Sequence, residues 1–329
     1  MAQPDTAPVL VADIGGTNTR VALADGAQVR QNTVTKYRNA EYPSLDRVLR
    51  TYLQERSIQV TGACVALAGP TRNGVGGLTN LDWRMDEALL REATGANHVA
   101  LLNDLVAQGY ALNHVADHDL TPVVSRPASR PGETRLMIGI GTGFNAAAVI
   151  STPGGLLVTP SEAGHANLPV RTERELRLCR FVETAHGFPA IEDVLSGRGL
   201  ERVHAFLDAA PDRSERPHAA QIMEAAERGN RHALDTLELF IGLMGTVAGN
   251  LSLIHLPFGG VYLVGGVARA MGPYLAAHGF SEAFANKGRF ADFMRQFPVW
   301  MLEDDFAALT GCAAYLAQGA PQGVGSSTG

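Results

Sequence analysis

Hydrophobic and polar positions along the chain follow two periods. Short continuous apolar runs, typical of buried strands, occur at residues 9–12, 63–68, 99–103, 136–140 and 261–264. Helical spacing appears between them: Leu45, Val48, Leu49, Tyr52 and Leu53 form one apolar face behind a potential N-cap at Ser44, and residues 85–94 and 105–112 also predict helices. Strands that alternate with helices predict an α/β fold with parallel strands.

One module recurs along the chain. The strand at 9–12 enters a glycine-containing turn at 13–18, and an apolar run resumes at 21–24. A similar strand, turn and strand occupy 136–150, after a break at 117–131 that contains several prolines. Residues 173–250 are mainly helical in pattern, with Gly242, Gly245 and Gly249 permitting close helix packing. The repeat predicts two related halves that meet at a cleft.

Composition narrows the class of protein. The 329 residues are 46% hydrophobic and 18% charged, which is typical of a globular chain with room for two domains. The formal net charge of -6 argues against a broad basic surface for nucleic acid or anionic lipid. The N-terminal segment lacks a secretory pattern, and no uninterrupted apolar stretch is long enough to span a bilayer. We therefore expect a cytoplasmic protein that acts on small molecules.

Several kinds of site are disfavoured. Cys64, Cys179 and Cys312 have no paired spacing, so buried reduced thiols are expected rather than disulfides or a zinc knuckle. Neither lysine of the chain follows a Gly-x-x-x-x-Gly pattern, and there is no Gly-x-Ser-x-Gly nucleophile turn. His114 and His118 have a metal-ligand spacing but no evident third ligand, so they are more simply solvated loop residues.

The two glycine turns are candidate phosphate sites. Glycines let backbone N–H groups approach a phosphate closely, which Gly15 and Gly16 could do, while Thr17 adds a hydroxyl and Asp13 could hold water on Mg²⁺. Gly141-Thr142-Gly143 offers the same chemistry. Each turn alone could be a plain hairpin, but the pair at comparable positions in two halves favours a clamp on a triphosphate.

Asn103 and Asp104 stand where a buried strand gives way to a helix, the edge of an α/β sheet at which ligands usually bind. Asp104 could simply cap the helix that starts at Leu105. It could also be a base that deprotonates an alcohol during phosphoryl transfer, with Asn103 holding a neighbouring hydroxyl. The sequence leaves both interpretations open.

Glu162, His165 and Glu192 are candidate sugar ligands. They lie beyond the second glycine turn, and carboxylates and imidazoles suit the many hydroxyls of a sugar. For each residue, the competing interpretation is an ordinary surface or helix-capping side chain.

The chain resembles the bacterial glucokinases of the hexokinase, actin and heat-shock ATPase superfamily. The motifs that carry the resemblance occur in family order: Asp13-Ile14-Gly15-Gly16-Thr17-Asn18, Thr79-Asn80-Leu81-Asp82-Trp83, Asn103-Asp104, Gly141-Thr142-Gly143, Glu162-Ala163-Gly164-His165, Val194-Leu195-Ser196-Gly197 and Gly265-Gly266. They cover almost the whole chain. The absence of a cysteine-rich zinc motif favours the group outside the repressor and sugar-kinase (ROK) family.

The resemblance implies a fold and a reaction. The fold would be a two-domain actin-like ATPase, related to ribonuclease H, whose domains close over ATP and glucose. Residues 1–113 plus 303–318 would form the small α/β domain, 114–302 the large α/β domain, and 319–329 a disordered tail. The reaction would be ATP-dependent phosphorylation of the 6-hydroxyl of glucose, with Mg²⁺, in a homodimer.

The resemblance also implies roles for individual residues. Asp104 would be the catalytic base. The sugar ligands would be Asn103, Asp104, Glu162, His165 and Glu192. The nucleotide would be bound by Asp13, Gly15, Gly16, Thr17, Asn18, Gly141, Thr142, Gly265 and Gly266, with the last two on the adenosine side and Asp13 serving Mg²⁺ through water.

Two departures from the family pattern affect these expectations. Phe144-Asn145 replaces the usual Leu-Gly after the second turn, which could alter the grip on the nucleotide or the choice of phosphoryl donor. Ala308-Leu309-Thr310-Gly311 replaces the usual Gly-Leu-Leu-Gly near the C-terminus, which leaves the packing there open. Alternative functions are a kinase for another hexose or an amino sugar, and a non-catalytic sugar-sensing regulator on the same fold.

Overall fold

The computed structural model describes residues 7–78, 81–125, 132–208 and 216–319. The chain forms two compact units: the first contains the chain up to Ala116, Ser151–Thr159 and the chain from Asp304, and the second contains Asp117–Ile150 and Pro160–Glu303. The predicted tail at 319–329 lies outside the described residues except for Gly319, as do Thr79 and Asn80 of the second family motif.

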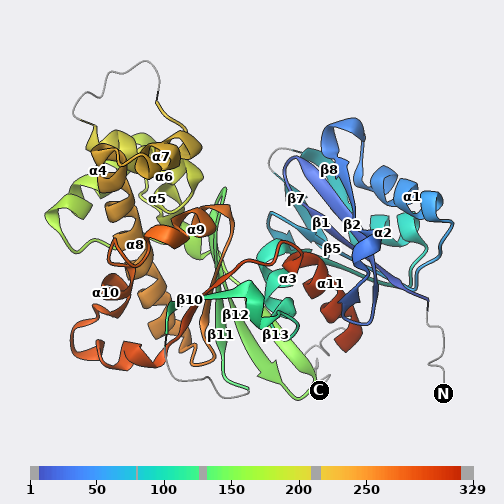
Figure 1. The fold of residues 1–329 in the computed structure, drawn as a ribbon. Coiled ribbons are helices and arrows are strands. Elements are labelled where there is room, and N and C mark those ends of the chain that lie inside the picture. The colour runs from blue at the N-terminus through green and yellow to red at the C-terminus, as the bar shows by residue number, and fades with distance from the viewer. Residues whose placement is uncertain (1–6, 79–80, 126–131, 209–215, 320–329) are drawn as a thin grey trace, which may run out of the picture. The chain divides into compact units, whose positions relative to one another are not determined.

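The first unit is built on a mixed sheet with helices on both faces (Figure 1). Its strands are β1 (Val9–Ile14), β2 (Asn18–Asp25), β3 (Gln28–Val29), β4 (Thr35–Arg38), β5 (Gly62–Leu67) and β9 (His98–Asn103). Their order is β3-β2-β1-β5-β9, with β4 also paired to β2. β1 runs antiparallel to β2 and parallel to β5, and β5 runs parallel to β9.

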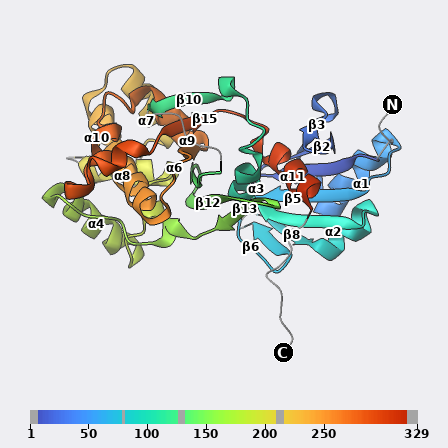
Figure 2. The same ribbon diagram turned by 90° about the horizontal axis from the view of Figure 1, so that it is seen from below.

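Side chains that alternate along β1 divide the core of this unit. Leu10, Ala12 and Ile14 pack with α1 (Leu45–Arg56) and α2 (Glu87–Thr94), whereas Val11 packs on the opposite face with α3 (Asp104–Ala111) and α11 (Ala307–Gln318). α11 lies beside α3 (Figure 2), where a β-carbon at Gly311 would come 1.7 Å from the carbonyl oxygen of Ala107. The glycine retained in the altered C-terminal motif thus allows this close helix contact.

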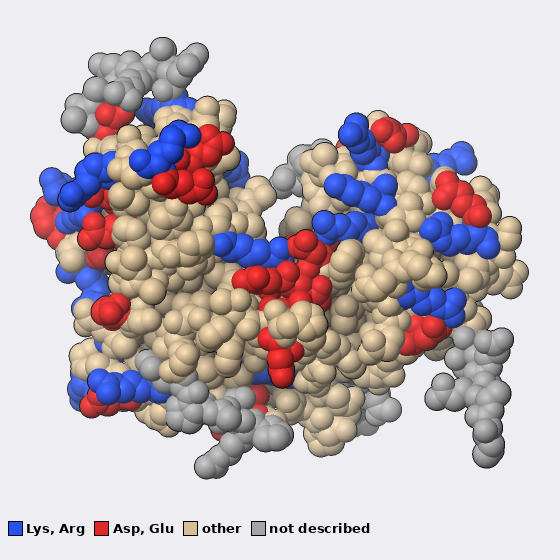
Figure 3. All heavy atoms as spheres, in the orientation of Figure 1, with Lys and Arg blue, Asp and Glu red and all other residues tan. Residues whose placement is uncertain are grey.

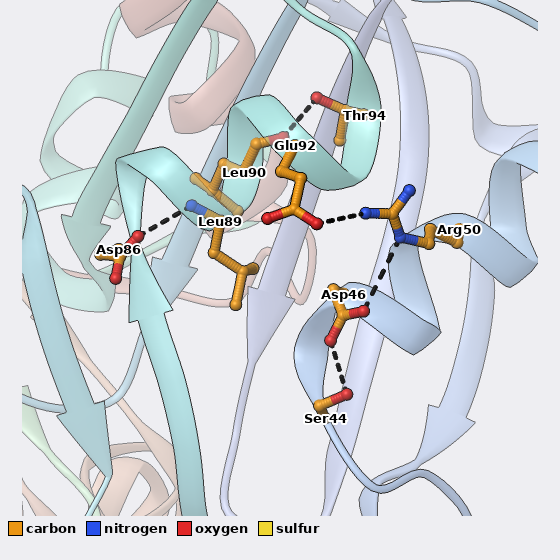
Figure 4. A network of polar contacts seen from close by, with 8 residues as sticks. All are labelled: Ser44, Asp46, Arg50, Asp86, Leu89, Leu90, Glu92 and Thr94. Atoms are coloured by element: carbon orange, nitrogen blue, oxygen red, sulfur yellow. Dashed lines mark hydrogen bonds and ion pairs between the residues drawn. The ribbon is translucent and has the colours of Figure 1, made fainter.

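α1 and α2 are joined by polar contacts as well as by their apolar faces. Arg50 of α1 contacts Asp46 at 3.7 Å and Glu92 of α2 at 3.2 Å (Figure 4). The predicted N-cap Ser44 stands at the start of α1, but its hydroxyl donates to Asp46 at 2.6 Å instead of capping a backbone N–H.

Strand formation before α2 was missed by the sequence pattern. The helix predicted from residue 85 begins at Glu87, because Asp86 accepts from the backbone N–H of Leu89 and ends the strand β8 (Leu81–Asp86). β8 belongs to a small antiparallel sheet with β6 (Thr71–Arg72) and β7 (Val75–Leu78). The sequence pattern did not reveal this sheet, because its strands are short and β7 is rich in glycine.

The second sheet repeats the plan of the first. Its strands are β10 (Leu120–Val124), β11 (Arg135–Ile140), β12 (Phe144–Thr152), β13 (Gly155–Pro160), β14 (Val261–Val264) and β15 (Val299–Leu302), in the order β10-β15-β14-β11-β12-β13. β11 is antiparallel to β12 and parallel to β14, and β14 is parallel to β15. The run β12-β11-β14-β15 therefore matches β2-β1-β5-β9 in order and direction, which confirms the predicted repeat. β10 was not predicted, because its Pro122 lies in the proline-containing break and is tolerated on an edge strand.

Helices fill the rest of the second unit. They are α4 (Glu173–His186), α5 (Ile191–Val194), α6 (Gly197–Leu207), α7 (Ala219–Glu227), α8 (Arg231–His255), α9 (Gly266–Met271) and α10 (Phe280–Ala285). α8 is long and apolar enough to cross a membrane by length and composition, but 72% of its apolar window is buried inside the structure. α10 approaches it closely, since β-carbons at Gly245 and Gly249 would lie 2.5 and 2.4 Å from the carbonyl oxygens of Phe280 and Phe284. Gly242, in contrast, faces open space.

Candidate functional site

The first glycine turn joins β1 to β2 and is held by one buried side chain. Gly15 donates its N–H to the carbonyl of Asn18 at 3.0 Å, while Gly16 and Thr17 are exposed. Asn39, 2% exposed, donates its side-chain amide to the carbonyl of Gly15 at 2.8 Å and its backbone N–H to the carbonyl of Thr17 at 2.9 Å. The side-chain oxygen Oδ1 of Asn39 accepts from the hydroxyl of Thr19 at 2.8 Å. Asn39 therefore fixes the turn.

No pattern in the sequence indicated this role for Asn39. It lies in the short 3-10 turn η2 (Asn39–Glu41), after β4, and no motif marks it. Only the antiparallel pairing of β4 with β2, which aligns Asn18 with Arg38, brings Asn39 to the turn.

Asp13 stands at the carboxyl end of β1, directly opposite Arg20 of β2. The Arg20 guanidinium lies 3.8 Å from the Asp13 carboxylate and also donates to the backbone carbonyl of Asp305 at 3.2 Å. Burial raises the pKa of Asp13 above its usual value, and the charge of Arg20 opposes this rise. The Asp13 carboxylate thus lies beside the first glycine turn, and Arg20 partly offsets its negative charge.

Asn103, not Asp104, caps α3. The side-chain oxygen of Asn103 accepts from the backbone N–H groups of Leu105 and Val106 at 3.0 and 3.3 Å, and its amide donates to the carbonyl of Gly69 at 3.1 Å. Asp104 is the first residue of the helix and accepts from the N–H of Leu105 at 2.8 Å. The capping role considered for Asp104 thus falls mainly to its neighbour, whose side chain also hydrogen-bonds the Asp104 carboxylate.

Electrostatics distinguish Asp104 among the carboxylates of the first unit. Burial, and after it the nearby negative charge of Asp13, raise its pKa to about 6, and the N–H of Leu105 opposes both effects. A carboxylate whose pKa lies near neutral pH is suited to accept a proton and release it again. Asp13, the first turn, Asn103 and Asp104 therefore gather at the carboxyl ends of the strands in one sheet.

The second glycine turn joins β11 to β12. Gly141 donates to the carbonyl of Gly143 at 2.9 Å, and the N–H of Gly197, at the start of α6, donates to the carbonyl of Gly141 at 2.9 Å. Thr142 is exposed. Ser196 caps α6 by accepting from the N–H of Gly199 at 3.0 Å, so the Val194-Leu195-Ser196-Gly197 motif serves to start a helix against this turn.

Glu192 of α5 lies directly against this turn. Its Oε2 accepts from the N–H of Phe144 at 2.9 Å, and a β-carbon at Gly143 would lie only 2.5 Å from the same oxygen. The other carboxylate oxygen of Glu192 has no hydrogen-bond partner among the described residues and can accept from a ligand.

Glu162 and His165 are exposed at the two ends of a short loop that includes the 3-10 turn η4 (Ala163–His165). Gly164 between them is buried. It packs closely against the backbone of Phe144, since a β-carbon there would lie 2.1 Å from the carbonyl oxygen of Phe144. The second turn, Glu192 and the loop thus form one cluster in the second unit.

Gly265 and Gly266 connect β14 to α9, at the carboxyl end of the strand beside β11. Gly265 has φ of +99°, and a β-carbon there would lie 2.4 Å from the carbonyl oxygen of Ile140. Glycine is therefore required at this position for both backbone conformation and space. Gly266 is exposed with nothing within 4 Å of a β-carbon.

The potential metal ligands and the cysteines are not assigned a function in this site. Within the described ranges, no group of three or more His, Cys, Asp or Glu side chains could hold a metal ion. The cysteines are free thiols in the structure, with Cys64 and Cys312 buried and Cys179 partly so. On the face drawn in Figure 3, Lys and Arg side chains are interspersed with Asp and Glu side chains.

Magnesium bound together with a nucleotide needs no cage made of protein alone. Mg²⁺ keeps several waters and typically takes one or two carboxylates plus substrate phosphates. The carboxylates of Asp13 and Asp104, close enough for the charge of one to raise the pKa of the other, fit that pattern.

The family model and the most similar relatives agree on one family. The model of the Glucokinase family matches residues 10–319. A glucokinase of Tolumonas auensis is 32% identical over 314 residues, which cover 94% of this chain and 97% of the relative. The crystal structure of a glucokinase from an Antarctic psychrotroph aligns with a TM-score of 0.83 and 30% identity over 94% of this chain and 98% of that one.

A more distant structure extends the likeness of the fold. A Balamuthia mandrillaris glucokinase, crystallised in complex with glucose, aligns with a TM-score of 0.78 at 21% identity over 95% of this chain and 94% of that one. The order of the motifs, the mixed α/β fold and the match of the family model over nearly the whole chain agree: the protein belongs to the glucokinase family.

Proposed function

We propose that the protein transfers the γ-phosphoryl group of ATP to the 6-hydroxyl of glucose, with Asp104 as the base. The observation that carries this proposal is the environment of Asp104: a carboxylate at the carboxyl edge of a sheet, with a pKa raised to about 6, in the unit that also holds the first glycine turn. Phosphoryl transfer needs mainly positioning and charge stabilisation, which such an arrangement supplies.

Each remaining residue has a proposed task. The phosphates lie against the first turn, made of Gly15, Gly16, Thr17 and Asn18, and against Gly141 and Thr142 of the second, where the exposed hydroxyls of Thr17 and Thr142 donate to them and the glycines allow a close approach of the backbone. Gly265 and Gly266 border the adenosine. Asp13 would hold Mg²⁺ through water, and the bound ion would supply positive charge to the phosphates. Asn103, Glu162, His165 and Glu192 hydrogen-bond the sugar, and Asp104 takes the proton from its 6-hydroxyl.

We further propose an actin-like ATPase fold and a place outside the ROK group. The matching strand order of the two sheets supports an actin-like ATPase fold, in which one α/β plan occurs twice. The cysteines at 64, 179 and 312 do not form the cysteine-rich motif of the ROK group, which supports placement outside it. We also propose a cytoplasmic homodimer on the basis of the family; light scattering of the purified protein tests the dimer.

A coupled assay of ADP formation tests the reaction. Glucose should be the best acceptor in a panel with mannose, fructose and N-acetylglucosamine, and the product should carry phosphate on its 6-oxygen by NMR. Faster turnover of another sugar in the panel would assign the protein to a different hexose or amino sugar. Silence on every sugar with ATP would contradict the proposed function.

A further inference from the structure

Asn145 lies two residues after the second glycine turn. Its amide was expected to alter the grip on the nucleotide or the choice of phosphoryl donor. In the structure the preceding Phe144 is buried, 4% exposed, and Asn145 is half-buried at the start of β12. Its polar atoms are engaged with the loop that carries Glu162.

The carbonyl oxygen of the Asn145 side chain holds the backbone of this loop. It accepts from the N–H of Ala163 at 3.1 Å and lies 3.2 Å from the hydroxyl of Ser161. It also accepts from the N–H of Ala146 at 2.8 Å, which fixes the rotamer of the amide. The Ser161 hydroxyl donates to the carbonyl of Ala146 at 2.8 Å and so ties the same loop to β12.

The amide nitrogen of Asn145 faces the carboxylate of Glu162. The distance to Oε2 is 3.5 Å, longer than the roughly 2.7–3.2 Å of a typical N–H···O hydrogen bond. Glu162 is otherwise exposed, and among the described residues Asn145 supplies its hydrogen-bond donor. An exposed glutamate loses considerable rotamer entropy when a ligand fixes it, so prior orientation lowers the cost of binding.

We propose that Asn145 is a positioning residue for sugar recognition: it fixes residues 161–163 and aims the carboxylate of Glu162 at the sugar. This inference rests on the proposed function, in which Glu162 hydrogen-bonds glucose. Of the two residues that replace the usual Leu-Gly of the family, Asn145 would therefore affect binding of the acceptor sugar and not binding of the nucleotide.

Two substitutions separate the parts of this role. Asn145→Ala removes the acceptor for Ala163 and the donor for Glu162. Asn145→Asp keeps the acceptor but places a negative charge against the Glu162 carboxylate. Asn250→Ala is a matched control, since it removes an amide oxygen in the same unit that accepts from Lys287 at 2.7 Å and has no part in the site.

The measurements are the KM for glucose, the KM for ATP, kcat and the Kd for glucose by calorimetry without nucleotide. For Asn145→Ala we expect both glucose constants to rise about five- to tenfold, as for the loss of one or two hydrogen bonds, while the KM for ATP changes less than about twofold. Asn145→Asp should fold with an unchanged Tm and lose glucose affinity at least as strongly. Asn250→Ala should leave the glucose Kd unchanged.

Three outcomes would overturn the inference. Wild-type glucose affinity in Asn145→Ala would show that the loop needs no such support. Wild-type affinity in Asn145→Asp would show that Glu162 is not aimed by the amide. A rise confined to the KM for ATP would return Asn145 to the nucleotide. A wild-type protein that neither binds nor phosphorylates glucose would instead contradict the proposed function itself.

Discussion

The carboxylate of Glu192 accepts a hydrogen bond of 2.9 Å from the backbone N–H of Phe144, at the end of the second glycine turn. A residue expected to bind the sugar thus forms a hydrogen bond with a turn expected to bind phosphate. The absence of a β-carbon at Gly143 makes this contact possible, because the Glu192 carboxylate occupies that space.

Gly143→Ala should therefore displace Glu192 while leaving the fold intact. The clash involves the flexible end of a side chain, at 2.5 Å, and the φ of Gly143 is not positive. We expect the KM for glucose to rise on the order of tenfold, as for the loss of a hydrogen bond to a charged group, with little change in Tm. Steady-state kinetics and thermal unfolding measure both.

Gly141→Ala is the matched control in the same turn. A β-carbon there meets nothing within 4 Å, so any effect should come from interference with bound phosphate and appear in the KM for ATP. Equal effects of the two substitutions on the glucose KM would refute the proposed link between Gly143 and Glu192.

Asn39→Ala should loosen the first glycine turn. The change removes the donor to Gly15 and leaves the buried hydroxyl of Thr19 without its acceptor, which typically costs about 1–3 kcal/mol of stability. We expect the KM for ATP to rise several-fold and the glucose Kd to stay near its wild-type value. Urea unfolding and nucleotide titration test this, and an unchanged KM for ATP would count against a phosphate role for this turn.

Activity should depend on the ionisation of Asp104. Its pKa of about 6 means that the base is protonated, and inactive, below that pH. We therefore expect kcat/KM for glucose to fall about tenfold per unit below about pH 6 and to level off above about pH 7. A profile that stays flat down to about pH 4, the usual range of an aspartate, would contradict the raised pKa.

The same pKa shift predicts that Asp104→Asn stabilises the protein at neutral pH. A raised pKa means that the folded state prefers the neutral carboxyl, so this contribution to stability is present below about pH 4 and is lost as the pH rises through about 6. Asparagine is neutral throughout. Nucleotide-free Asp104→Asn should exceed wild type by up to about 3 kcal/mol at pH 8, and the difference should vanish near pH 4. Urea unfolding at both pH values measures this, and equal stability at pH 8 would show that burying the charge has no cost.

Local patterns were enough to predict most of the architecture. Continuous apolar runs located β1, β5, β9, β11 and β14, and the repeated strand, turn and strand predicted two related halves. The patterns failed where strands were short or rich in glycine and proline, as in β7 and β10. Pairing partners distant in sequence define such strands.

Site residues showed a similar limit. The glycine turns and the Asn103-Asp104 junction were recognisable because their chemistry lies in adjacent residues. The capping role of Asn103, the support given by Asn39 and the attachment of Asn145 to Glu162 depend on hydrogen bonds across the fold. No spacing rule within the chain predicts them.

The most direct test of Asp104 as the proton acceptor is Asp104→Ala, assayed for glucose phosphorylation with saturating ATP and Mg²⁺. Far-UV circular dichroism and glucose calorimetry should first establish that the variant is folded and still binds the sugar. We expect kcat to fall about 10²-fold or more, as for the loss of a general base. Turnover near the wild-type rate in a folded, glucose-binding variant would contradict Asp104 as the proton acceptor.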